Sequence, residues 1–184
     1  AQASRPDLAI SDGHLNIVFA LERDKRAQVM LLRVKLDDPQ LKSGLQPLDE
    51  KEKRAQRYKK PEDRVVGKIE RVSTEYGKHS QPRIACAKVG CFTSWDDEKA
   101  GALGAFVDPS KGQAIWHKEF ARQGSRPAVA SAPWGAGVAW FEGGRVKVAA
   151  INRDGVQEGS VVGRVGGLQP YPAIVPDTEA GQWY

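Results

Sequence analysis

The stretch from Pro82 to Asp97 reads PRIACAKVGCFTSWDD, and its pattern decides the predicted fold. An alanine lies three residues after the proline, and a tryptophan, Trp95, lies thirteen residues after it. A short apolar segment follows the proline, a turn comes next, and a second apolar segment ends at the tryptophan. Two apolar segments separated by a tight turn predict a β-hairpin.

The same pattern occurs four times along the chain: Arg or Gln before a proline, then the alanine, then a large aromatic residue. The four aromatic residues are Phe19, Trp95, Trp140 and Trp183, and the four prolines are Pro6, Pro82, Pro127 and Pro170. The prolines are 76, 45 and 43 residues apart. A period near 45 residues suits a unit of four short strands, as in the blade of a propeller.

We therefore predict an all-β fold of antiparallel β-propeller blades, with about three and a half four-stranded units. The expected units are residues 5–80, 81–125 and 126–168, with a partial fourth unit at 169–184. The first unit is longer than the others, which predicts an insertion at about 39–64. Tight turns are expected at Asp12-Gly13 and at Trp134-Gly135-Ala136-Gly137, because glycine permits the positive φ that short hairpins require.

Two of these segments, Pro82–Asp97 and Pro127–Gly155, resemble the repeats of bacterial secreted β-propeller proteins. In those repeats a Pro-x-Val-Ala segment, a turn and an apolar strand ending in Trp-x-Asp follow one another. The resemblance implies a blade fold and an exported protein, but no particular activity, because propellers carry many functions. Phe19 departs from the pattern, which has tryptophan at this position.

The composition is that of a globular protein of about one domain. The chain has 184 residues, with 28 Lys and Arg against 23 Asp and Glu, giving a formal charge of +5. This mild excess permits an anionic partner without requiring one. No stretch approaches the ~20 apolar residues of a transmembrane helix, which excludes an integral helical membrane protein.

The tryptophans invite two interpretations. Trp95, Trp140 and Trp183 recur at a fixed offset, which favours packing between blades over ligand binding. Trp134 lies outside the repeat position, at a predicted hairpin tip, and is therefore a candidate binding residue.

The two cysteines, Cys86 and Cys91, flank the predicted turn of the second hairpin. Strands that fold back over this turn bring two Cβ atoms within disulfide range. Buried free thiols are the main alternative, whereas a metal site is not expected, because the three histidines are scattered singly. A disulfide indicates an oxidising compartment, and Ala1-Gln2-Ala3 is similar to the small-residue end of an export signal.

The insertion contains the chain's densest basic segment, within residues 49–64. Its candidate binding residues are Lys53, Arg54, Arg57, Lys59 and Lys60. They could bind a polyanion, but interleaved acidic residues weaken the positive field, so nucleic acid is not the expected partner. A solvated loop or a protein-docking segment are the alternatives.

No catalytic residue, metal or cofactor is predicted, because the common enzyme motifs are missing from the sequence. Residues 108–116 resemble the Asp-box of sialidase-like propellers, but Ser110 stands in place of the aspartate and Trp116 is one residue late. The acidic residues that follow the repeat aromatics, Asp96, Asp97, Glu98 and Glu142, are expected to face solvent.

The leading hypothesis is a non-enzymatic, exported propeller segment that acts as a protein-interaction or scaffolding module. A glycan-binding or glycan-cleaving propeller of the sialidase or lectin kind is the first alternative, and a polyanion binder using the insertion is the second. Three and a half blades fall short of a closed ring, so the chain is expected to be a fragment whose partner is another chain or missing blades.

Overall fold

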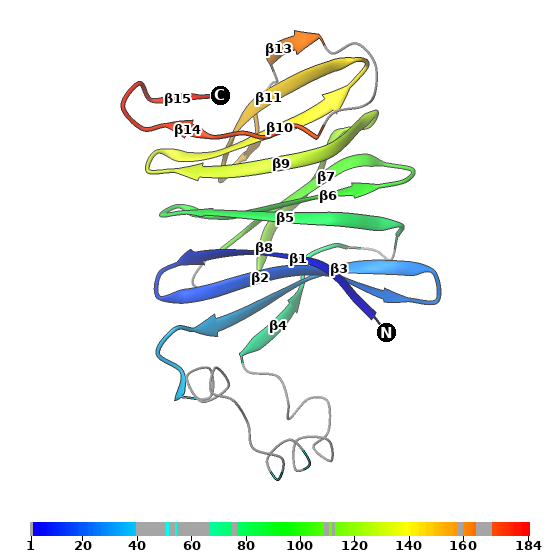
Figure 1. The fold of residues 1–184 in the computed structure, drawn as a ribbon, viewed down its shortest axis with the longest axis vertical. Helices are drawn as coiled ribbons and strands as arrows, with labels where there is room; N and C mark the ends of the chain where they lie inside the picture. Colours follow the sequence, from blue (N-terminus) through cyan, green and yellow to red (C-terminus); the bar gives the residue numbers. More distant parts are fainter. Residues whose placement is uncertain are drawn as a thin grey trace.

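The computed structural model describes residues 2–39, 51, 54, 67–74, 77–108, 111, 113–157, 160–164 and 171–184. Every named element in this described part is a β-strand, and the strands form antiparallel sheets that lie one above the next (Figure 1). The predicted fold class, all-β with antiparallel blades, is confirmed.

The first blade is a meander of four strands in the order in which they occur along the chain. Its strands are β1 (Gln2–Ser11), β2 (His14–Arg23), β3 (Arg26–Lys35) and β4 (Lys68–Arg71). The expected turn between β1 and β2 is present at Asp12 and Gly13, with φ of 46° and 69°. Both residues adopt the left-handed conformation, which matches the twist of a two-residue hairpin.

The second blade repeats this order, and the third varies it at its outer edge. The second blade consists of β5 (His79–Ala87), β6 (Gly90–Asp97), β7 (Gly101–Val107) and β8 (Ala114–Ala121). The third consists of β9 (Gly124–Ala132), β10 (Gly135–Glu142) and β11 (Arg145–Asn152), with β12 (Gly155–Val156) and β13 (Ser160–Arg164) both paired to β11. A last hairpin, β14 (Pro176–Asp177) and β15 (Gln182–Trp183), follows.

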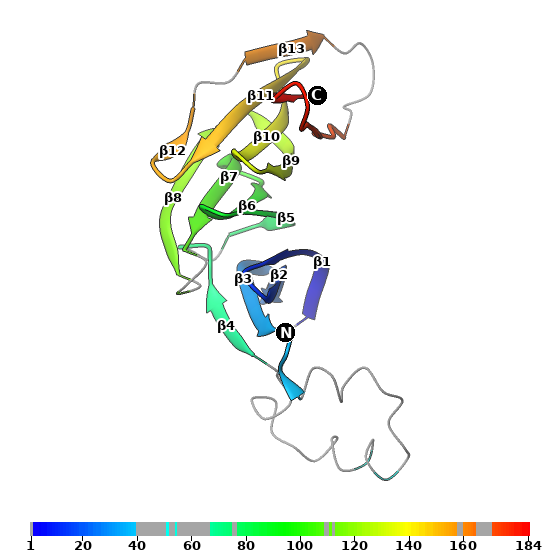
Figure 2. The same ribbon diagram turned by 90° about the vertical axis from the view of Figure 1, so that its left-hand side faces the viewer.

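The blades stack into an arc with the first strand of each blade on its concave side. Strand β5 contacts both β1 and β9, and the three run side by side (Figure 1). Figure 2 shows these inner strands along one side of the arc and the outer strands β4, β8 and β12 along the other. This arrangement places the residues of the inner strands on one shared surface.

Two hydrophobic cores fill the spaces between adjacent blades. The first joins Val18, Val29 and Leu31 of the first blade to residues of the second that include Trp95, which is 2% exposed. The second joins Phe92 and Phe106 of the second blade to residues of the third, including Trp140. The repeat aromatic therefore packs against the preceding blade, as the packing interpretation of Trp95 and Trp140 predicts.

Three of the repeat prolines, Pro6, Pro82 and Pro127, lie within strands, and Pro170 lies outside the described residues. Gln81 and Arg126, which precede Pro82 and Pro127, have φ of 51° and 56°, and the strand register shifts at both places. Each proline thus lies at a β-bulge, where the missing N–H costs no ladder hydrogen bond.

The turn expected at Trp134–Gly137 is shorter than predicted. Only Pro133 and Trp134 form it, and Gly135 already begins β10. Gly137 is instead needed for packing, because a Cβ at this position would lie 2.9 Å from the Trp183 ring and 3.0 Å from Ile174. The glycine thus allows the C-terminal hairpin to approach the third blade.

Candidate interaction surface

The two faces of the first blade have different surroundings. Residues paired across an antiparallel sheet share a face, and successive residues alternate between faces. Val18 and Leu31 are paired and fully buried, and they pack against the second blade. The residues on either side of Val18 in β2 and of Leu31 in β3 consequently lie on the opposite face.

This opposite face, here called the outward face, is apolar. Leu8, Ile17, Leu32 and Ile69 pair in turn across all four strands of the blade, and Phe19 pairs with Met30 beside them. The outward face comprises Leu8, Ile10, Leu15, Ile17, Phe19, Met30, Leu32 and Ile69, together with the buried Val34, which pairs with Leu15, and Arg71, which pairs with Met30. Of these, Leu8 and Ile10 are each 61% exposed and Ile69 is 41% exposed. Exposed apolar side chains in such a continuous row are typical of an interaction site.

The position of Phe19 in the repeat relates the outward face to the interfaces between blades. It occupies the repeat position of Trp95 and Trp140, which pack against the blade that precedes their own. Phe19 points in the equivalent direction, onto the outward face, but no blade precedes its own among the residues that the structure describes. The outward face therefore has the position and composition of a blade-to-blade interface.

The C-terminal hairpin has one side that packs on the third blade and one side that is exposed. Trp183 makes an edge contact with Trp134 at 5.9 Å between ring centroids, and Ile174 is buried on the same side. Val175 and Tyr184 exchange two backbone hydrogen bonds and so lie on the other side of the hairpin. They are 57% and 64% exposed. Together they form the C-terminal face.

A cleft of about 700 Å³ lies between the first two blades. Within it, His79 Nδ1 lies 3.1 Å from a carboxylate oxygen of Asp97, and the His79 ring meets Trp95 edge-on at 5.9 Å. Burial acts to raise the pKa of Asp97, but the backbone N–H groups of Ala100 and Lys99 and the charge of His79 outweigh it and lower the pKa. The ionised carboxylate therefore orients His79 against the inter-blade core.

Of the four acidic residues that were expected to face solvent, Glu98 is exposed, but the prediction was wrong for Asp96, Asp97 and Glu142. The Asp97 side chain is only 11% exposed. Asp96 is half-buried and accepts a hydrogen bond from the backbone N–H of Arg126 at 2.6 Å. Glu142 is also half-buried, and it binds Lys147 and the Trp140 indole N–H. A linear sequence does not indicate these contacts, because they depend on how neighbouring blades and strands pair.

The residues predicted for binding have different outcomes. Trp134 lies at the turn between β9 and β10 and is 44% exposed. Arg54 is exposed, whereas Lys53, Arg57, Lys59 and Lys60 lie outside the described residues. Their role in binding stays a prediction.

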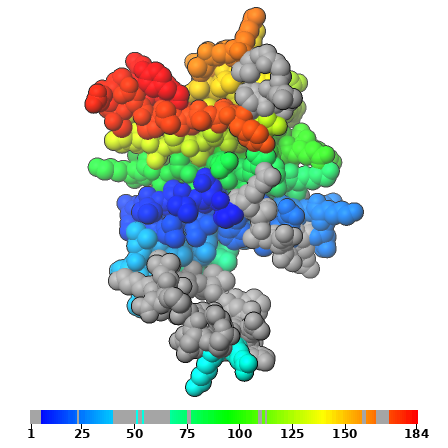
Figure 3. Space-filling view, viewed as in Figure 1, coloured from blue at the N-terminus to red at the C-terminus, as the bar shows by residue number. Residues whose placement is uncertain are grey.

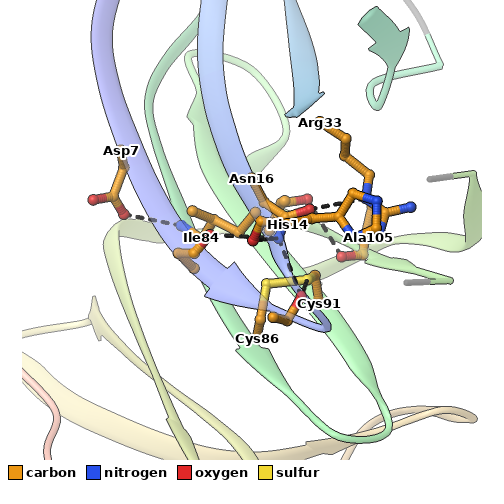
Figure 4. The surroundings of a disulfide bond; sticks show 11 residues. Asp7, His14, Asn16, Arg33, Ile84, Cys86, Cys91 and Ala105 are labelled. Carbon is orange, nitrogen blue, oxygen red and sulfur yellow. Dashed lines mark hydrogen bonds between the residues drawn. A yellow bond between two sulfur atoms is a disulfide. The ribbon is translucent and has the colours of Figure 1, made fainter. Parts of the chain in front are cut away.

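The predicted disulfide is confirmed. Cys86 and Cys91 are bonded, with 4.0 Å between their Cα atoms, and they pair across the turn from β5 to β6 (Figure 4). The Sγ of Cys91 also lies 3.6 Å from the Ser11 hydroxyl of the first blade.

Among the described residues, no group of His, Cys, Asp and Glu has the arrangement of a metal site. The same part of the chain contains no helix that is both long and apolar enough to cross a membrane.

Comparison with known proteins gives structural likenesses but no sequence match. No family model and no curated protein matches the sequence. Among solved structures, the chain is similar to the catalytic domain of the GH62 alpha-L-arabinofuranosidase of Coprinopsis cinerea, with 6% sequence identity and a TM-score of 0.49. The match covers 88% of this chain and 51% of that one, so the chain spans about half the length of that structure.

Proposed function

We propose that this protein is a non-enzymatic, exported interaction module that binds another protein chain through the outward face of its first blade. The observation that carries the proposal is the position of Phe19 on the outward face, which is apolar around it and against which no other blade packs among the described residues. The Cys86–Cys91 disulfide supports export, because disulfides persist mainly in oxidising compartments.

The partner that fits this face is a second copy of the chain. Within the chain, the side of a blade that carries the repeat aromatic packs against the opposite side of the blade before it. The C-terminal face, with Val175 and Tyr184, is such an opposite side. One copy would therefore place its C-terminal face against the outward face of the next, which continues the internal interface in a head-to-tail manner.

The energetics favour such an association. Complete burial of a large aliphatic side chain contributes roughly 1.5–3 kcal/mol. Leu8 and Ile10 are more than half exposed and would account for much of the gain, with smaller contributions from Phe19 and Ile69. Part of this gain offsets the loss of translational and rotational freedom, so we expect association at micromolar concentrations.

Sedimentation velocity between 1 and 100 µM, on the order of the micromolar Kd that we expect, tests the proposal. The unmodified chain should change from monomer to larger species over this range. Leu8→Glu should remain monomeric, because it places a charge in the interface. Val162→Glu is the matched control, since Val162 is 65% exposed on β13 and belongs to neither face. A chain that remains monomeric at 100 µM would overturn the proposal.

A further inference from the structure

One position of the repeat carries a different type of side chain in each blade, and these side chains lie on the concave side of the arc. The residue directly after the repeat proline is Asp7, Arg83, Ala128 or Tyr171 in the four repeats. In the first three repeats this residue belongs to an inner strand, β1, β5 or β9, and Tyr171 lies five residues before the start of β14. The inner strands run side by side, so positions that are 43 to 76 residues apart in the sequence become neighbours.

These four residues line a single hollow. It encloses about 300 Å³, and Gln81, Arg126 and Ile174 also contribute to its wall. Figure 3 views the concave side, where the inner segments of successive blades follow one another from blue through green and yellow to orange. The volume is at the lower end of the ~300–1,000 Å³ range of small-molecule sites, which suits one or two sugar rings.

The polar side chains of the hollow are held in place by the fold. Asp7 accepts a hydrogen bond from the backbone N–H of Ile84 at 3.0 Å, which fixes its carboxylate at the junction of two blades (Figure 4). The guanidinium carbon of Arg126 lies 4.1 Å from the centre of the Tyr171 ring. This stacking orients a ring that is itself 64% exposed.

Arg83 supplies an available cation. Its side chain is exposed, and no ion pair engages it in the part of the chain that the structure describes, although Asp7 lines the same hollow. An arginine in this state can bind a carboxylate in a bidentate manner. The hollow therefore combines two guanidinium groups, one exposed phenol ring and one carboxylate.

We propose that this hollow binds a saccharide that carries a carboxylate. Arg83 binds the carboxylate of the sugar, and Arg126 adds positive charge beside it. The exposed part of the Tyr171 ring packs on the C–H groups of a sugar ring, and Asp7 accepts hydrogen bonds from sugar hydroxyls. The Asp7 carboxylate adds a negative charge to the same hollow, so a saccharide with a single carboxylate on the bound sugar is favoured over a polyphosphate or a nucleic acid, which carry more negative charge.

Calorimetric titration of the full chain with tri-galacturonate and with 3′-sialyllactose tests this assignment. We expect saturable binding of at least one of them, and at least tenfold weaker binding of the neutral counterpart, the methyl ester of the same saccharide. Arg83→Gln and Tyr171→Ala should each raise the Kd at least tenfold. Arg122→Gln is the matched control, because Arg122 pairs with Glu119 at an exposed turn away from the hollow.

Two results would overturn the proposal: saturable binding of neither acidic saccharide, or an unchanged Kd in Arg83→Gln. The Leu8→Glu variant separates this proposal from the one on self-association. It alters the outward face and leaves the hollow unchanged, so its saccharide affinity should equal that of the unmodified chain.

Discussion

The carboxylate of Asp96 accepts a hydrogen bond from the backbone N–H of Arg126 at 2.6 Å, and so joins the second blade to the third. Arg126 lies at the bulge before Pro127, where its N–H has turned away from the ladder of β9. Burial raises the pKa of Asp96, although the N–H and the charge of Arg126 act to lower it. The bond thus supplies a partner for a backbone donor that the bulge removes from the sheet.

Removal of this acceptor should destabilise the fold. Asp96→Ala leaves the N–H of Arg126 without its partner, and we expect a loss of about 1–3 kcal/mol in the free energy of unfolding. Urea denaturation measures this loss. Glu179→Ala, at an exposed turn of the C-terminal hairpin, is the control and should change the midpoint little. Equal midpoints for the two variants would show that the bond is dispensable.

The contribution of Asp97 should depend on pH. Its pKa is lowered in the folded protein from the ordinary value of 3.8, so the stabilisation is complete above that value and is lost as the pH falls through the folded pKa. Asp97→Asn should therefore be less stable than the unmodified chain at pH 6, and the difference should shrink below pH 4, about the pKa of an unperturbed aspartate. Denaturation curves at several pH values check this, and a difference that does not vary with pH would contradict it.

Trp140 and Trp134 provide a matched pair for the packing argument. Trp140 is 3% exposed and meets Phe120 edge-on at 5.4 Å, whereas Trp134 is 44% exposed. We expect Trp140→Ala to lose about 3–5 kcal/mol of stability, the usual effect of emptying a buried aromatic site. Trp134→Ala should lose clearly less. Similar urea midpoints for the two variants would refute the assignment of the repeat aromatic to the core.

The Cys86–Cys91 disulfide should strengthen the fold without being essential to it. The two cysteines are five residues apart in the sequence, and such a small closed loop contributes about 2 kcal/mol. Reduction should lower the urea midpoint but leave the circular dichroism of the strands. Mass spectrometry of native material should find no alkylatable thiol, and two such thiols would contradict both the bond and export.

The blades could be predicted from the sequence because they depend on local patterns. The spacing from Pro82 to Trp95 and from Pro127 to Trp140 indicates hairpins, and the recurrence of the aromatic indicates its burial. The turn at Asp12-Gly13 follows from the conformational freedom of these residues.

The candidate sites could not be predicted, because they depend on pairing between distant segments. Leu8 and Ile69 share the outward face only through the register of four strands. Asp7, Arg83 and Tyr171 occupy the same position of the repeat, but only the stacking of blades brings them to one hollow. Sequence comparison of the repeats at the position after the proline is the one signal that could have identified them.

The most direct test of the proposed self-association mixes two variants. Leu8→Glu places a charge on the outward face and leaves the C-terminal face intact. Val175→Glu places a charge on the C-terminal face and leaves the outward face intact. In head-to-tail association each variant alone should be monomeric in sedimentation velocity, whereas an equimolar mixture should form dimers through the one intact interface. Two results would contradict the account. One is a Val175→Glu chain that still associates alone, and the other is a mixture that remains monomeric while the unmodified chain associates.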